Sequence, residues 1–259
     1  MPETAGLPDL PTFANAPPSR PQRRFASAVS AAFALLTLAL LPIVTDPVGA
    51  MPGFVPSYQA ALITVYAVTT YLFFAQYRRT ASVPLLVLAA GSLFTTLIVA
   101  VQLLTFPGVF APGRILGSGP GTTTWLWTLW HVGPPLFALP YAIMEGDGRP
   151  RWVRPDRVGR VGGLAALAVV AGVAMLTWVV VAWVEYLPRC VDGDDYRLLT
   201  TSGIGPGVMV LTLVALATLC WTTRSRCCSS SSTTWSPCRA RRGEAWAGSP
   251  DGWRRSPPA

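Results

Sequence analysis

Long apolar runs separated by short polar segments are the main pattern of the chain. A helix needs about 20 apolar residues to cross a bilayer. Six runs approach or exceed that length: residues 25–44, 60–77, 81–104, 124–144, 161–184 and 204–221. None of them contains an arginine or a carboxylate, and the fourth contains the single histidine, His131. We therefore predict an all-α fold, a polytopic transmembrane bundle of about six spans.

The fourth run differs from the others because it contains Pro134, Pro135 and Pro140. Proline removes a backbone hydrogen bond and collides with the preceding turn of a helix. Transmembrane helices tolerate proline where neighbouring groups satisfy the freed carbonyls. We expect this helix to be kinked or broken near its middle.

The positions of the arginines predict how the bundle is oriented. All 20 basic residues are arginine, and 17 of them fall in alternate segments that share one side of the membrane, against three on the other side. Loops rich in positive charge face the cytoplasm. We therefore expect a multi-pass protein of the bacterial inner membrane with both termini in the cytoplasm.

Composition agrees with the apolar runs. Hydrophobic residues make up 51% of the chain and charged residues 12%, which is about half the charged share of a soluble domain. A net charge of +8 is compatible with nucleic-acid binding, but in a membrane chain the one-sided distribution of arginine explains it. We expect the lipid bilayer, and not nucleic acid, as the partner.

Three regions follow from these patterns. Residues 1–24, with six prolines, read as a disordered cytoplasmic lead, and residues 25–221 as the transmembrane domain. Residues 222–259 form a low-complexity tail rich in Arg, Ser and Cys. The tail has two interpretations: a disordered basic segment near anionic headgroups, or the product of a shifted reading frame in a GC-rich gene. We favour the second, in which the native product continues with further helices.

The most distinctive segment joins the third and fourth runs. His131 lies about seven residues below the predicted outer boundary, roughly 10 Å deep at 1.5 Å per residue. An ionisable group at this depth marks a functional site or a paired interior position. Trp127, one turn earlier, shares its helix face, and Tyr141 falls near that face if the helix continues. Candidate sensing residues are Phe106, Gly108, Trp127, Trp130, His131 and Tyr141.

Two interpretations of His131 are open at this point. In the first, the histidine lines a small pocket that opens outward and serves as hydrogen-bond partner, proton acceptor or ligand. In the second, it is a neutral histidine bonded to a neighbouring helix. We do not choose between them on sequence alone.

The sequence contains no recognisable catalytic, metal or cofactor site. With one histidine, serine, cysteine and carboxylate constellations lack their usual partner. Bis-histidine haem is excluded, and five-coordinate haem at His131 is a minor alternative. The five cysteines lack metal-ligand spacing, and a cation on Asp192, Asp194 and Asp195 is less plausible than a solvated loop. We expect no enzyme activity, no metal and no cofactor.

Three stretches resemble the fourth class of membrane-associated sensor (MASE) domains: residues 89–113, residues 125–131 and residues 135–142. The resemblance covers about residues 25–221. It implies a sensory input domain fused to a cytoplasmic diguanylate cyclase or histidine kinase. The chain departs from that plan because no output domain follows and the last helices of such a module are missing after about residue 222.

We therefore predict an integral-membrane sensory input domain of a bacterial signalling protein, without a catalytic output of its own. It would act on a cytoplasmic cyclase or kinase output, or through self-association. The alternative is a small membrane transporter or channel subunit. That alternative requires a chain of polar groups across the bilayer, and the spans offer few strongly polar side chains, Gln102 and His131 among them.

Overall fold

The computed structural model describes residues 19–40, 53–106, 120–147, 149, 151–190 and 197–229. Its helices are, in chain order, α1 (Arg20–Leu40), α2 (Phe54–Thr80), α3 (Val83–Thr105), α4 (Pro120–Gly146), the short 3-10 helix η3 (Pro155–Arg157), α5 (Val158–Ala182), α6 (Arg197–Thr201) and α7 (Ile204–Ser229). In this part of the chain the only extended pairing is an isolated bridge between Ser82 and Trp152. The all-α prediction is confirmed.

Each predicted apolar run corresponds to one long helix. The helices α1, α2, α3, η3 with α5, and α7 are long and apolar enough to cross a membrane. Helix α4 has 27 residues, about 40 Å at 1.5 Å per residue, but its prolines, glycines and threonines make it less apolar. The structure is therefore consistent with about six spans.

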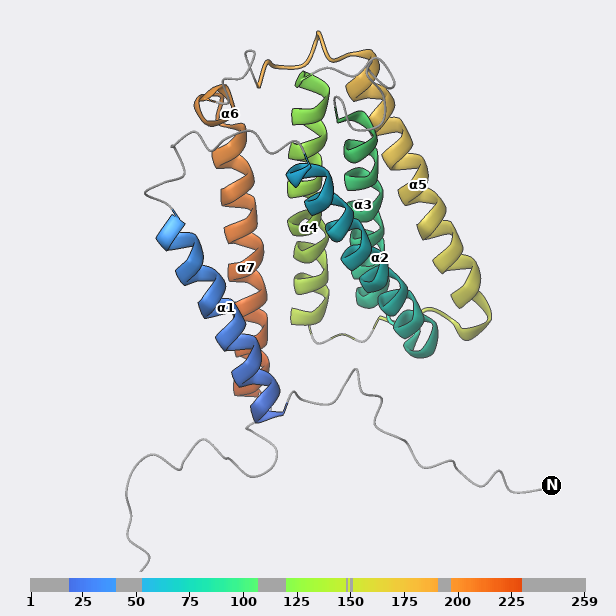
Figure 1. The fold of residues 1–259 in the computed structure, drawn as a ribbon. Coiled ribbons are helices and arrows are strands. Elements are labelled where there is room, and N and C mark those ends of the chain that lie inside the picture. Colours follow the sequence, from blue (N-terminus) through green and yellow to red (C-terminus); the bar gives the residue numbers. More distant parts are fainter. Residues whose placement is uncertain are drawn as a thin grey trace, which may run out of the picture.

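Of the two outcomes predicted for α4, a kink or a break, the break is absent. The helix runs from Pro120 to Gly146 with Pro134, Pro135 and Pro140 inside it. Helix α4 lies between α3 and α7 and packs against both along the bundle (Figure 1). Packing on two sides holds the backbone helical, although the prolines remove three of its hydrogen bonds.

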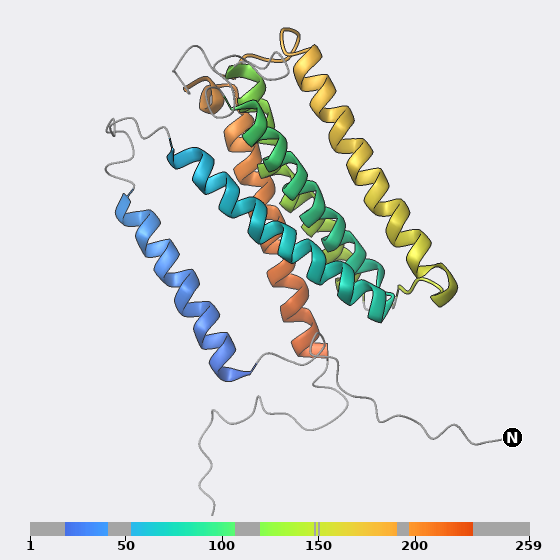
Figure 2. The same cartoon turned by 45° about the vertical axis from the view of Figure 1, so that its right-hand side comes forward.

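The helices form one bundle with a peripheral member. Helix α3 packs against α2, α4 and α5, and α7 packs against α4. Helix α1 has no buried residue. It overlaps α7 in the view of Figure 1, but Figure 2 shows it standing apart from the other helices. Helices α2, α3, α4, α5 and α7 therefore supply the described core.

Glycines allow α3 and α4 to approach closely. A Cβ on Gly91 would lie 2.6 Å from Cβ of Phe137, and a Cβ on Gly133 would lie 2.6 Å from Cε1 of Phe94. The two phenylalanine rings stand 5.8 Å apart between these glycines. Small residues at helix crossings are the usual means by which membrane helices pack, since lipid gives little hydrophobic drive for their association.

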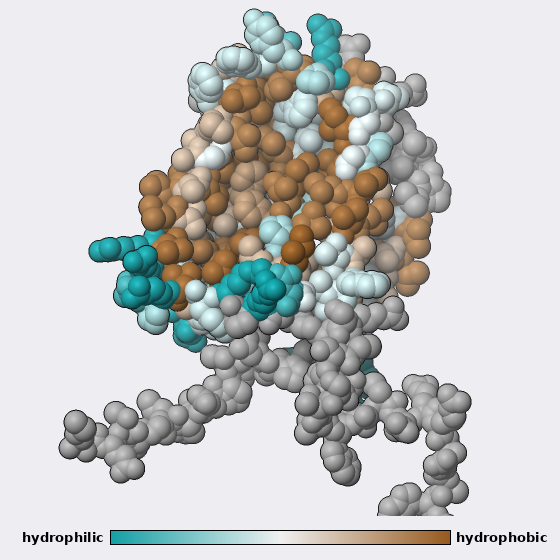
Figure 3. Space-filling view, turned by 180° about the vertical axis from the view of Figure 1, so that it is seen from behind, coloured by the Kyte–Doolittle hydropathy of each residue, from teal (hydrophilic) through white to brown (hydrophobic). Residues whose placement is uncertain are grey.

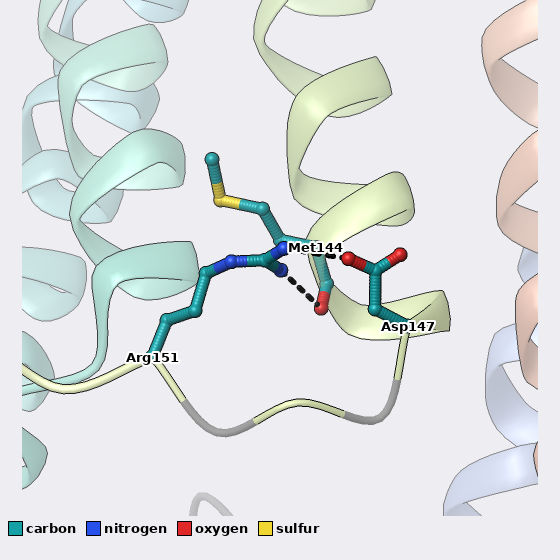
Figure 4. Close-up of polar contacts among 3 residues, drawn as sticks. All are labelled: Met144, Asp147 and Arg151. Atoms are coloured by element: carbon teal, nitrogen blue, oxygen red, sulfur yellow. Dashed lines mark hydrogen bonds and ion pairs between the residues drawn. The ribbon is translucent and has the colours of Figure 1, made fainter.

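One end of the bundle is tied together by the segment between α4 and α5. The Nη1 atom of Arg151 donates to the Met144 carbonyl at 3.1 Å, and its Nη2 bonds the Asp147 carboxylate at 2.5 Å (Figure 4). Carbonyls in the last turn of a helix have no partner in the helix itself, so this guanidinium caps α4. The Arg151 carbonyl in turn accepts from the amide of Val83 at 3.0 Å.

A second contact at this end joins α2 to α5. The hydroxyl of fully buried Tyr77 donates to the Val158 carbonyl at 3.0 Å, and Gly162 lets the ring fit against α5. The Tyr77 side chain therefore holds α2 against the start of α5.

The outside of the bundle is apolar. Large hydrophobic side chains such as Leu72, Leu136, Leu167 and Leu213 are more than half exposed. Figure 3 shows a broad hydrophobic band over the helices with hydrophilic residues gathered toward its ends. Soluble proteins rarely expose apolar patches of this extent, so the chain is a multi-pass membrane protein whose surface is covered by lipid.

Candidate functional site

Helix α4 carries the candidate site and is held by its neighbours on several faces. Leu126 is fully buried in a cluster with Ile98 of α3 and Val173 and Val180 of α5. Gly146, at the other end of α4, would meet Thr222 of α7 if it carried a Cβ, at 2.8 Å. A change in the position of α4 would therefore alter its packing against α3, α5 and α7.

His131 is half-buried and makes its contacts within its own helix. Its Nδ1 lies 2.8 Å from the carbonyl oxygen of Trp127. Its ring centroid lies 3.8 Å from that of Trp127 and 3.7 Å from that of Trp130. The imidazole thus contacts two indoles, that of Trp127 one turn earlier and that of Trp130 one residue earlier.

The hydrogen bond fixes the tautomer of the neutral ring. A carbonyl oxygen only accepts, so Nδ1 carries the proton. In the neutral imidazole Nε2 then holds a lone pair and can accept. Nε2 has no hydrogen-bond partner among the described residues. Among the described residues, neither ring nitrogen of His131 bonds to another helix.

Trp130 connects this histidine to the core. Its ring packs against the cluster that contains Leu126 and Val173. Its indole Nε1 is buried and has no hydrogen-bond partner in the described part of the chain. A buried donor without a partner is costly. A ligand group that accepts a hydrogen bond from the Trp130 Nε1 would remove this cost.

The other predicted site residues lie elsewhere. Tyr141 is ten residues beyond His131 on the same continuous helix, which separates the two by about 15 Å along the axis. Phe106 follows the last turn of α3, where its amide bonds the Leu103 carbonyl at 3.3 Å. Gly108 lies outside the described residues. The structure thus brings together Trp127, Trp130 and His131.

Buried glutamines form a feature that the sequence reasoning missed. Gln59 of α2 and Gln102 of α3 are 4% and 3% exposed. Gln102 donates through Nε2 to the Thr123 carbonyl at 3.3 Å, and Oε1 of each glutamine is buried without a described partner. Gln102 was visible in the sequence as a polar residue in an apolar run, but nothing marked Gln59.

Aromatic residues mark the end of α5 nearest this site. The ring centroids of Trp178 and Trp183 are 6.3 Å apart, and those of Trp183 and Tyr186 are 6.0 Å apart. All three side chains are more than half exposed. The Trp125 indole also donates to the Pro188 carbonyl at 3.3 Å. This aromatic girdle is typical of a membrane interface.

The described residues include no group of three or more His, Cys, Asp or Glu placed to hold a metal ion. The acidic residues Asp192, Asp194 and Asp195 lie outside the described part.

Cys190 is 2% exposed. Burial raises the pKa of its thiol, so it stays protonated and poorly nucleophilic near neutral pH.

Comparisons with curated proteins and with solved structures found no match. A family model described as a membrane-associated sensor, integral membrane domain, matches residues 49–236. The match covers α2 to α7 and leaves out α1. It spans well over half of the chain and agrees with the helical membrane bundle described above. The chain therefore belongs to the MASE4 family of membrane-associated sensor domains.

Proposed function

We propose that the chain is the sensory input part of a bacterial signalling protein of the inner membrane. Membership of the sensor family supports the sensory role. The arginine distribution predicts that α7 ends on the cytoplasmic side. A diguanylate cyclase or histidine kinase output would be reached from that end.

The proposed sensing element is His131 between Trp127 and Trp130. The observation that carries this proposal is the geometry of the imidazole. Its Nδ1 donates a hydrogen bond to the Trp127 carbonyl within α4, while its Nε2 remains able to accept one. An incoming donor, or a proton, would change the charge or bonding of a ring packed against two indoles. Ionisable groups inside membrane helices are by default functional.

A conformational change that starts at His131 would reach α7 through its packing against α4. The two helices pack along their lengths, and they meet closely at Gly146 and Thr222. A stimulus that prefers one position of α4 shifts the population of bundle conformations by its difference in affinity for them. A difference of about 1.4 kcal/mol changes the ratio of two such states tenfold.

A chimera tests the sensory role. Residues 1–229 are joined to a diguanylate cyclase, and cyclic di-GMP is measured in cells under varied external pH, osmolarity, oxygen and nutrient supply. We expect at least one condition to change output several-fold, and Gly146→Val, which crowds Thr222, to reduce that change. Output that stays constant under every condition, together with solute flux in proteoliposomes, would favour the transporter alternative.

A further inference from the structure

Three exposed arginines lie where the segment after α4 leads into α5. They are Arg154, Arg157 and Arg160, and we call them the arginine cluster. Arg154 and Arg157 flank the short helix η3, and Arg160 lies in the first turn of α5. None of the three belongs to the proposed sensing element, so the cluster is a separate feature of the bundle.

Two arginines of the cluster converge on one carboxylate. The Nε atom of Arg154 lies 3.4 Å from Oδ1 of Asp156, and the Nε atom of Arg157 lies 3.8 Å from its Oδ2. Both distances exceed the about 2.7–2.9 Å of a charge-assisted hydrogen bond, and all three side chains are more than half exposed. Ion pairs of this kind contribute little stability. Two guanidinium groups can therefore reach one anion here, and a stronger anion could displace the carboxylate.

The backbone that carries the cluster is held in place. The amide of Val153 donates to the Ala81 carbonyl at 2.8 Å. The Tyr77 hydroxyl donates to the Val158 carbonyl at 3.0 Å. Because these bonds fix the backbone on both sides of Arg154 and Arg157, binding would order little more than the arginine side chains themselves.

The cluster lies at the edge of the apolar surface. Helix α5 begins at the lower end of the bundle in Figure 1, and Figure 3 shows hydrophilic residues adjoining the lower edge of the hydrophobic band. Trp152, two residues before Arg154, is 62% exposed, as is common for aromatic residues at a membrane interface. These features place the cluster at the level of the lipid headgroups.

Apolar side chains continue from the cluster along one face of α5. Arg157, Arg160, Leu164 and Leu167 follow one another at intervals of three or four residues, the spacing of a single helix face. Leu164 and Leu167 are 65% and 64% exposed. An occupant that matches the whole face combines an anionic group with apolar chains, whereas a free phosphate or an acidic peptide would match the arginines alone.

We propose that the arginine cluster binds the headgroup of one anionic phospholipid, such as phosphatidylglycerol, whose acyl chains lie along Leu164 and Leu167. Arg154 and Arg157 would hold the phosphate oxygens in place of Asp156, because guanidinium groups donate paired hydrogen bonds to phosphate. Arg160 would add a third positive charge, which favours an anionic headgroup over a zwitterionic one. This site goes beyond the proposed sensory function and does not rest on it.

Native mass spectrometry of the full chain measures the binding. Delipidated protein in detergent is titrated with phosphatidylglycerol, and the retained lipid is counted. We expect one tightly retained lipid in the wild type and at least tenfold weaker retention when Arg154→Gln and Arg157→Gln are combined. The matched control combines Arg23→Gln and Arg24→Gln, which remove the same charge from exposed positions of α1 and should leave retention unchanged.

A variant of the competing carboxylate separates binding from a structural role. Asp156→Asn should tighten lipid retention several-fold, because the two arginines no longer have to exchange one anion for another. If Asp156 instead serves to hold the arginines in position, the same variant weakens retention. The expected gain cannot arise from misfolding, so Asp156→Asn decides the matter even if the double arginine variant fails to fold.

Four results would overturn the proposal. Equal losses in the two double variants would show attraction to overall positive charge, and weaker retention in Asp156→Asn would show that no anion competes there. Phosphatidylcholine retained as tightly as phosphatidylglycerol would show that the headgroup charge is not recognised. Displacement of the lipid by an equal concentration of glycerol phosphate or polyglutamate would identify a soluble anion or an acidic protein segment as the occupant. Because binding is measured without the cyclase, none of these results depends on whether the chimera responds.

Discussion

The close approach of α3 and α4 makes a specific prediction about Gly91. In Gly91→Ala the new methyl would lie 2.6 Å from Cβ and 2.8 Å from Cγ of Phe137. Cβ is fixed to the backbone of α4, so rotation of the phenylalanine side chain does not relieve the contact. The helices themselves have to separate.

The size of the effect follows from two opposing terms. Overpacking of a close-packed interior costs about 1–3 kcal/mol, while alanine gains up to about 1 kcal/mol over glycine in a helix. We expect Gly91→Ala to lower the free energy of unfolding by about 1–2 kcal/mol. Gly163→Ala is the matched control, since a Cβ at Gly163 meets nothing within 4 Å and should leave stability unchanged or slightly higher.

Unfolding in mixed micelles of detergent and dodecyl sulfate, followed by circular dichroism, measures both variants. A second comparison uses Gly133, whose added Cβ meets Cε1 and Cδ1 of the Phe94 ring. Phe94→Ala removes those atoms, so the cost of Gly133→Ala should largely vanish in the double variant. If Gly91→Ala and Gly163→Ala have equal stability, the described packing of α3 on α4 is incorrect.

Two further predictions concern the tie at the end of the bundle and its orientation. Tyr77→Phe removes the hydroxyl that donates to Val158 and should lower the same unfolding free energy by about 0.5–1.5 kcal/mol; an unchanged value would show that this bond is not formed. In a chain whose native cysteines are replaced by serine, an impermeant maleimide added to intact cells should label Tyr186→Cys and not Arg154→Cys. Both positions are well exposed, so the reverse labelling would invert the predicted topology.

The spans were predictable because the bilayer imposes a simple rule on composition. A lipid-exposed helix has to be predominantly apolar over about 20 positions, and the runs predicted from this rule became α1 to α5 and α7. The rule does not say which helices touch. The role of Gly91, for example, depends on Phe137, and nothing in the sequence pairs the two.

The absence of a break in α4 has a related cause. The cost of Pro134 and Pro135 is local and can be read from sequence, whereas the packing of α3 and α7 that outweighs it is tertiary. The one-turn spacing correctly placed Trp127 against His131. It gave no reason to expect Trp130, one residue before the histidine, to reach the same ring, because helix neighbours usually point to different faces.

The most direct test of the central claim compares His131→Ala with Leu136→Ala in the cyclase chimera. Leu136 is 57% exposed on the same helix, so its truncation controls for expression and insertion. We predict that both variants insert and fold, that Leu136→Ala keeps the several-fold change in cyclic di-GMP, and that His131→Ala loses it. A response in His131→Ala equal to that of the wild type would contradict the assignment of α4 as the sensing helix.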